Sequence, residues 1–416
     1  EQPFQDGNIA MVGPSYLASV QYAVAASGLP SEVKTLVPAV YTTDLSTILY
    51  SNGMFRHETF TAWASMMRGS NSEADDAGGD YHKAIRHLPH NKVDTAVFGL
   101  PMSWYQDMID IERAKNTLFN NPDARLMNQV PENIDVPILM VSGWYDVFFG
   151  GQMADWERLA TRSSSRFVLG PWTHAGASGE AFEIENAQGG LFQWKEMLPW
   201  LDHHLKGQPL TNPPGLYTFT MGENEWHFYE EWPGPTTSKI FSLNDLPDSP
   251  SCDGGKLAFK KDSSGPVSYV YDPLDPVPTM GGAGMLAFIL PGFEGAAPAN
   301  VLQEGLCNRA DVLSFVTPAL DASLLISGEI SVNLEIASSA PDTAFTAKLM
   351  EVFPDGRAIN IRDNITSLAY RDGGLDRLAY SPGDPINVTI DMWPIEWRVS
   401  SGSRIRLDIS SSDFPK

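Results

Sequence analysis

Three residues whose side chains can together perform nucleophilic catalysis lie along the chain, each after a short apolar run. They are Ser15, Asp146 and His174. A serine hydroxyl becomes a nucleophile when an imidazole accepts its proton, and a carboxylate bound to the other ring nitrogen holds that imidazole in the required tautomer. We therefore predict that Ser15 is the nucleophile, that His174 acts first as general base and then as general acid, and that Asp146 orients the ring.

The serine lies on a predicted tight turn between a strand and a helix. An apolar run ends at Val12, and a helical pattern begins at Tyr16. On such a turn the hydroxyl points out of the carboxyl edge of the sheet, beside the free N–H groups of the helix start. We expect the backbone N–H of Tyr16 to stabilise an oxyanion. An alternative stays open, because Leu17 stands where the G-x-S-x-G motif ends in glycine, and a serine here can be an ordinary helix N-cap.

Asp146 and His174 also follow predicted strands, in the loops 142–148 and 169–174. Each has an alternative reading, since Asp146 could cap the next helix and a lone histidine is more often structural. The order serine, aspartate, histidine, with each residue after its own strand, is that of α/β-hydrolases. The coincidence of all three favours a triad over three separate structural roles.

The elements around these residues predict the sheet that positions them. Apolar runs indicate strands, and patterns of helical spacing lie between them. The expected strands are 8–12, 34–40, 136–141 and 166–169, and the expected helices are 16–27, 152–161 and 191–206. Alternation of strands and helices predicts a parallel α/β sheet.

Two further regions have different patterns. Residues 50–132 are helix-rich and interrupt the alternation, so we predict an inserted helical cap there. From about Pro213 short β-rich runs separated by Pro, Gly, Asp and Ser take over, which indicates an all-β sandwich or jelly roll. We therefore divide the chain into an α/β core of residues 1–49 and 133–207, a cap of residues 50–132, and a jelly roll of residues 208–416.

Composition excludes several classes of partner. Lys and Arg total 28 against 51 Asp and Glu, a formal net charge of −23, which disfavours nucleic acids and anionic membranes. Hydrophobic residues make up 43%, as in globular proteins, and no run approaches the roughly 18 apolar residues of a membrane helix. A soluble protein, cytoplasmic or secreted, is expected. We predict that Cys252 and Cys307 are free thiols, since they pair only if the fold happens to bring them together.

The motifs around the triad resemble those of the CocE/NonD family of serine hydrolases, which includes esterases, acylases and Xaa-Pro dipeptidyl-peptidases. The resemblance continues along almost the whole chain. It rests on Gly13–Leu17, Gly143–Asp146, Leu169–His174, Trp200–Gly207, Met221–Trp226, Tyr271–Thr279 and Asp311–Phe315. It implies an α/β-hydrolase domain with a C-terminal jelly roll, an ester, amide or peptide substrate, and no cofactor. It leaves a homodimer open.

The resemblance also implies residues of the substrate site. Phe148 matches an aromatic residue of the family's acyl pocket, and we place Trp144 and Trp172 in the pocket as well. Ala18 stands where the family usually has glycine. The family has strands before the serine turn, including a tyrosine whose hydroxyl is the second oxyanion donor, and its jelly roll continues further. We therefore expect the 416 residues to be a fragment that, by itself, is poorly soluble or partly unfolded and is nearly inactive.

Two alternatives remain. His82, His87 and His90 could suggest a metal site, but zinc ligands usually have tighter spacing and a Cys or carboxylate partner, so we predict no metal and assign them to the surface or to a lid. The rival to an esterase, acylase or dipeptidyl-peptidase is an inactive hydrolase remnant whose jelly roll binds carbohydrate or protein. An activated serine distinguishes the two.

Overall fold

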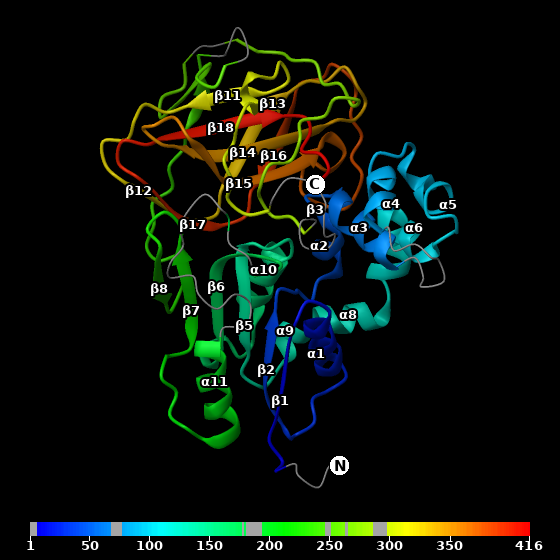
Figure 1. Cartoon of the computed structure of the whole chain (residues 1–416), viewed down its shortest axis with the longest axis vertical. Helices are drawn as coiled ribbons and strands as arrows, with labels where there is room; N and C mark the ends of the chain where they lie inside the picture. Colours follow the sequence, from blue (N-terminus) through cyan, green and yellow to red (C-terminus); the bar gives the residue numbers. More distant parts are fainter. Residues whose placement is uncertain are drawn as a thin grey trace.

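The computed structural model describes residues 6–67, 77–176, 179, 194–245, 251–262, 265–285 and 298–416. Figure 1 shows a sheet flanked by helices in the lower half, a β-rich body above it, and a group of short helices at one side. The predicted combination of an α/β domain, a helical insertion and a C-terminal β domain is therefore present.

The lower sheet is mostly parallel. Its strands, in spatial order, are β1 Ile9–Pro14, β2 Val33–Ala39, β5 Leu139–Tyr145, β6 Arg166–Thr173, β7 Gly215–Thr220 and β8 Glu225–Tyr229. Only β8 runs antiparallel to its neighbour. Every residue of β5 and β6 is buried, as expected where helices cover both faces of a parallel sheet. The carboxyl ends of β1, β5 and β6 lie at one edge of the sheet, where Ser15, Asp146 and His174 follow them.

Helices cover the two faces of this sheet because successive residues of each strand point to opposite sides. Met140 of β5 packs in the cluster that contains side chains of α1 (Tyr16–Ala26) and α10 (Phe149–Arg158). Its neighbours Leu139 and Val141 pack in a second cluster with residues of α11 (Trp194–Lys206). Helices therefore pack against both faces of the sheet and hold the strands whose carboxyl ends carry the three residues.

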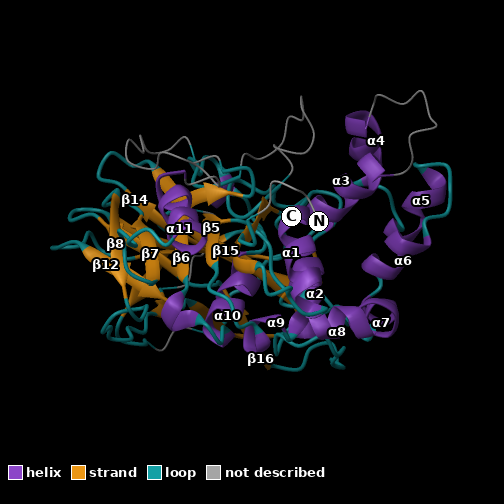
Figure 2. Ribbon diagram, turned by 90° about the horizontal axis from the view of Figure 1, so that it is seen from below, coloured by secondary structure: helices purple, strands orange, loops and turns teal. Residues whose placement is uncertain are grey.

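The helical insertion lies between β2 and β5. It contains α2 Leu45–Leu49, β3 Tyr50–Ser51, β4 Met54–Phe55, α3 His57–Met67, α4 Ala77–Ala84, α5 Val93–Ala96, α6 Ser103–Ile109, α7 Ile111–Ala114, α8 Pro122–Asn128 and α9 Val130–Asn133. Figure 2 shows α3 to α7 standing to one side of the two sheets. The last two helices, α8 and α9, pack instead against α1. We keep residues 50–132 as a proposed cap.

Two of the histidines that we predict for the surface or a lid, His82 and His90, differ in burial. His82 is exposed, but His90 is half-buried against His57, with 4.2 Å between ring centroids. His90 Nε2 lies 2.6 Å from the Tyr105 hydroxyl, and His57 Nε2 lies 3.0 Å from the Ile85 carbonyl. Burial lowers the pKa of His57, and burial together with the charges of His57 and His87 lowers the pKa of His90 to about 3. Of the two predicted places, surface or lid, His90 lies in the helical insertion, against partners that are distant in sequence.

This pair predicts a pH-dependent stability. Below the ordinary histidine pKa of about 6.5, His57 and His90 bind protons in the unfolded chain but stay neutral in the folded cap. The free energy of unfolding therefore falls as the pH falls from about 6.5 towards 3. Each such proton contributes up to about 1.4 kcal/mol per pH unit. His90→Gln should therefore flatten the decline of the melting temperature between pH 7 and pH 5, whereas the exposed control His82→Gln should not. Equal slopes for wild type and His90→Gln would contradict the assignment.

The C-terminal body is built mostly from antiparallel strands, and β10 with β11 is a parallel pair. Its main sheet has the order β15, β14, β18, β11, β10, β9, and two further pairs are β12 with β17 and β13 with β16. The bounds are β9 Ser242–Asn244, β10 Gly255–Ala258, β11 Leu313–Val316, β12 Leu324–Gly328, β13 Ser331–Ile336, β14 Ala344–Val352, β15 Ala358–Ser367, β16 Ile386–Asp391, β17 Ile395–Val399 and β18 Arg404–Ser410. Its core belongs to the same apolar cluster as α1 and α10, so the two bodies share one core.

One expectation about this half was wrong, that of two free thiols. The start of the jelly roll at residue 208 stays a prediction; β7 pairs in parallel with β6 and β8 pairs with β7, so both strands extend the α/β sheet as far as Tyr229. Their β-rich composition did not reveal which sheet they join. Cys252 and Cys307 form a disulfide, with Cα atoms 4.8 Å apart, although 55 residues separate them in sequence. The chain path, which the sequence does not show, brings them together.

A buried carboxylate joins the two bodies. Glu396 of β17 has no exposed surface and accepts hydrogen bonds from the hydroxyls of Thr218 and Thr220 on β7. The hydroxyl of Tyr229 and the indole N–H of Trp232 donate to it as well, at 3.0 and 2.6 Å. Four uncharged donors thus satisfy a charge that burial alone would destabilise strongly.

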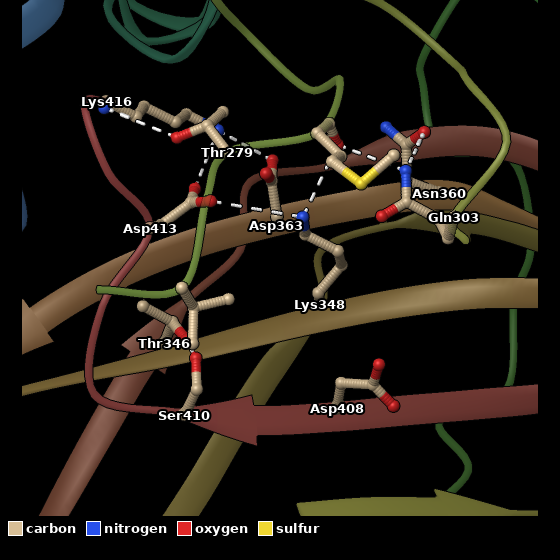
Figure 3. A network of polar contacts seen from close by, with 12 residues as sticks. Thr279, Gln303, Thr346, Lys348, Asn360, Asp363, Asp408, Ser410, Asp413 and Lys416 are labelled. Atoms are coloured by element: carbon tan, nitrogen blue, oxygen red, sulfur yellow. Dashed lines mark hydrogen bonds and ion pairs between the residues drawn. The ribbon is translucent and has the colours of Figure 1, made fainter. Parts of the chain in front are cut away.

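A polar network within the C-terminal body fixes the loop that contains Thr279 (Figure 3). Lys416 Nζ lies 2.8 Å from Asp363, and Lys348 donates to the carbonyl of Met280. Beyond this anchored point the loop reaches the cap, where the backbone N–H of Met285 donates to Glu58 of α3 at 2.9 Å. The network therefore places a segment of the C-terminal body next to helix α3.

Candidate active site

Ser15 lies on a strained turn between β1 and α1. Its φ and ψ are 53° and −122°, a conformation that residues other than glycine rarely adopt and that often marks functional sites. A Cβ at Gly13 would collide with the Cβ of Leu17, so the turn requires glycine at position 13 even though position 17 carries a side chain. Ala18, which stands where the family usually has glycine, is fully buried, so its methyl group fits into the core at the start of α1.

The hydroxyl of Ser15 does not cap the helix. It makes no capping hydrogen bond to α1, and its Oγ lies 3.0 Å from Nε2 of His174. Nδ1 of His174 lies 2.7 Å from Oδ2 of Asp146. The structure therefore brings the three predicted residues into one hydrogen-bonded chain, although 159 positions separate the serine from the histidine.

Asp146 is held from two sides. Its side chain has no exposed surface, and its Oδ1 accepts the backbone N–H of Phe148 at 2.7 Å. This bond belongs to the turn that leads into α10, but the N-cap residue of α10 is Phe148, so Asp146 is not the helix cap of the alternative reading. The second oxygen remains directed at His174, whose side chain is only 3% exposed.

Of the three aromatic residues predicted for the pocket, the structure brings one to the triad. The ring of Phe148 lies edge-on to the His174 ring at 5.2 Å and contacts Tyr41 at 5.8 Å. It belongs to an apolar cluster with residues of the cap and with Met285 of the C-terminal body. Tyr41 and Met285 were missed, because nothing in their local sequence links them to a catalytic serine.

Trp144 and Trp172 do not line the site. Trp144 is fully buried, donates its indole N–H to the carbonyl of Phe219 and packs against Trp232. Trp172 is buried in the opposite cluster, beside Trp226. The sequence predicts loops at both positions, but β5 continues to Tyr145 and β6 to Thr173. Both indoles therefore belong to strand residues and enter the faces of the sheet.

A buried arginine of the cap lies near Asp146 and was also missed. Arg56 donates to the carbonyl of Thr47, and its guanidinium lies over the ring of Trp393, 5.1 Å from the centroid. Burial lowers the pKa of Arg56 to about 10, while the negative charge of Asp146, followed by that of Glu58, opposes the shift. The carboxylate of Asp146 thus faces a positive charge besides its imidazole partner.

The sequence predicts no metal site at His82, His87 and His90. In the described part of the chain, side chains of metal-ligand type come within 4.8 Å of one another at Glu223, Glu225 and His227 instead. Glu223 already pairs with Arg398 at 2.7 Å, and this hairpin lies at the edge of the sheet opposite to β1. We assign no metal there.

A mostly parallel sheet with a Ser–His–Asp hydrogen-bonded chain at its carboxyl edge defines an α/β-hydrolase domain. Residues 1–176 match the family described as X-Pro dipeptidyl-peptidase (S15 family), and residues 210–416 match the X-Pro dipeptidyl-peptidase C-terminal non-catalytic domain. The chain belongs to this S15 and CocE/NonD group of hydrolases.

The chain is similar to one curated relative over its whole length and to two solved structures in fold. Cocaine esterase of Rhodococcus sp. (strain MB1 Bresler) is 29% identical over 442 aligned residues, which cover all of this chain and 75% of the esterase. The structure of an α-amino acid ester hydrolase superposes with a TM-score of 0.76 at 22% identity, covering 99% of this chain and 70% of that one. A CocE/NonD family hydrolase from Staphylococcus aureus gives 0.61 at 12% identity, covering 100% and 66%. These similarities support a hydrolase of the esterase or peptidase type.

Among the described residues, no helix has both the length and the apolar character that crossing a membrane requires.

Proposed function

We propose that the protein is a serine hydrolase that cleaves an ester or amide bond through an acyl-enzyme. The observation that carries the proposal is the chain of contacts from Ser15 Oγ through His174 to Asp146, with lengths of 3.0 and 2.7 Å. The negative charge of the buried Asp146 stabilises the imidazolium that forms when His174 accepts the serine proton.

The reaction proceeds in two halves. Ser15 Oγ attacks the carbonyl carbon while His174 takes its proton, and His174 then gives that proton to the leaving alcohol or amine as the acyl bond breaks. Water repeats the sequence on the acyl-enzyme and releases the acid. The backbone N–H of Tyr16, at the start of α1, donates to the oxyanion, and Phe148 contacts the acyl group. The chemistry uses side chains of this chain and needs no cofactor.

We favour a small-molecule ester, or an amide cleaved by an acylase, over a peptide. The 29% identity to cocaine esterase over the whole chain supports the ester. The apolar cluster around Phe148 supports an acyl group with little polar character. A dipeptidyl-peptidase activity is the second candidate, supported by the two matches to X-Pro dipeptidyl-peptidase families.

A fluorophosphonate probe tests the proposal directly. Only an activated serine reacts, so we expect one adduct by intact mass, located to Ser15 by peptide mapping, and prevention of labelling by prior acylation with a p-nitrophenyl ester. The control Ser27→Ala, at the far end of α1, should label normally. A protein that takes up no probe would favour the alternative, an inactive hydrolase remnant that binds carbohydrate or protein.

A further inference from the structure

An arginine of the C-terminal body reaches the end of β5, directly before Asp146. Arg362 lies on β15, and its side chain is almost fully buried, at 3% exposure. Its Nη1 donates to the backbone carbonyl of Trp144, two residues before Asp146. Its Nε and Nη2 donate to the carbonyl of Pro394 at 3.1 and 2.6 Å. One planar guanidinium thus joins the α/β domain to the C-terminal body beside the proposed triad.

The same guanidinium contacts residues on both sides of the aspartate. It lies 5.8 Å from the ring centre of Tyr145 and 5.0 Å from that of Phe149, the first residue of α10. The hydroxyl of Tyr145 in turn donates to the carbonyls of Asn360 and Ile361 on β15, at 3.4 Å each. The backbone before and after Asp146 is therefore fixed against one strand of the C-terminal body.

Burial of the charged Arg362 side chain costs free energy, and packing alone does not explain why a charged residue is present there. Burial lowers the pKa of Arg362 to about 10, so the charge is held under a desolvation penalty. The charged or ionisable groups that offset it are Tyr145, Asp363 and Asp391, and its printed hydrogen bonds go to backbone carbonyls rather than to a carboxylate. Apolar side chains of similar volume often replace a whole buried ion pair without loss of stability, so a buried charge is weak evidence of a stabilising role. A role in geometry accounts for the arginine better than a role in stability.

We propose that Arg362 is a positioning residue for Asp146, so that the C-terminal body sets the geometry of the Ser15–His174–Asp146 chain. The inference rests on the proposed serine hydrolase function. Arg362 joins the carbonyl of Trp144 to that of Pro394 in the C-terminal body, and Trp144 lies within the turn closed by the Asp146 N–H and the Gly143 carbonyl. This turn fixes the carboxylate that orients His174. A displacement of about 1 Å in a catalytic group can cost about 10²-fold in rate.

The test compares Arg362→Met with Arg406→Met. Arg406 is also a buried arginine of the C-terminal body, at 5% exposure, but it pairs with Asp408 on its own strand. With a p-nitrophenyl ester, we expect Arg362→Met to lower kcat by about 10- to 100-fold with KM within about threefold of wild type. Arg406→Met should keep kcat within about threefold at temperatures below its melting transition. Arg362→Lys retains a charge that can reach one of the two carbonyls and carries the same test if Arg362→Met does not fold.

A second readout does not depend on turnover. The hydrogen bond between His174 Nδ1 and Asp146 gives a low-field proton resonance in NMR spectra, which we expect to shift or vanish in Arg362→Met and to persist in Arg406→Met. Unchanged kcat and an unchanged resonance in the folded Arg362 variant would overturn the inference, and so would equal losses in both variants. If the wild type neither hydrolyses the ester nor takes up the probe, the proposed function fails, and the resonance alone decides the role of Arg362.

Discussion

Ser15→Ala is expected to lower kcat for a p-nitrophenyl short-chain ester by about 10⁴- to 10⁶-fold, because the variant has no hydroxyl to form the acyl-enzyme. The residual rate should come from substrate binding and oxyanion contacts, which elsewhere leave about 10³–10⁴ over water. The fold should be unaffected, since the Ser15 hydroxyl makes no capping bond to α1. Steady-state kinetics and a melting curve of the purified variant measure both effects.

The control for this variant is Ser27→Ala. Ser27 ends the same helix and its hydroxyl donates to the carbonyl of Ala23, far from His174. This variant should retain wild-type turnover. Retention of more than a few per cent of activity by Ser15→Ala would show that another group is the nucleophile.

Asp146→Asn is expected to lower kcat by about 10⁴-fold while the fold survives. The amide oxygen can still accept the backbone N–H of Phe148, as Oδ1 of the aspartate does at 2.7 Å. The amide NH₂ would then face Nδ1 of His174 and favour the tautomer that cannot accept the serine proton. Kinetics at saturating ester and the melting temperature together measure the two consequences.

Asp155→Asn is a matched control on α10. Asp155 is also a buried carboxylate, but it accepts hydrogen bonds from Thr42, Thr43 and Arg158 rather than from His174. It should lower the melting temperature and leave kcat near the wild-type value. If Asp146→Asn instead loses much stability and keeps normal catalysis, Asp146 has only a structural role.

The sequence predicted the triad because its signals are local. Each of Ser15, Asp146 and His174 follows a short apolar run, and parallel strands necessarily bring their carboxyl ends to one edge. The ends of the strands were harder to predict. The apolar runs stop near Val141 and Leu169, whereas pairing between β5 and β6 continues to Tyr145 and Thr173. The positions of the two tryptophans in the sheet were missed for this reason.

The remaining features depend on contacts between distant parts of the chain. Arg56 and Arg362 carry no local pattern that distinguishes them from surface arginines, and their partners are side chains and carbonyls of other segments. The pairing of Cys252 with Cys307 likewise depends on how β10 and the segment before β11 lie together. Composition and spacing do not contain such information when one sequence is read alone.

The bonds of Glu396 have a consequence for how the protein unfolds. Separating the two bodies would expose this carboxylate's four donors, Thr218, Thr220, Tyr229 and Trp232, together with the apolar core that the bodies share. The amino-acid composition changes at the Pro- and Gly-rich stretch 207–214, but the contacts that stabilise the fold cross this stretch. Residues on either side of it should therefore melt in one cooperative transition, and a cut there would not release two independently stable halves.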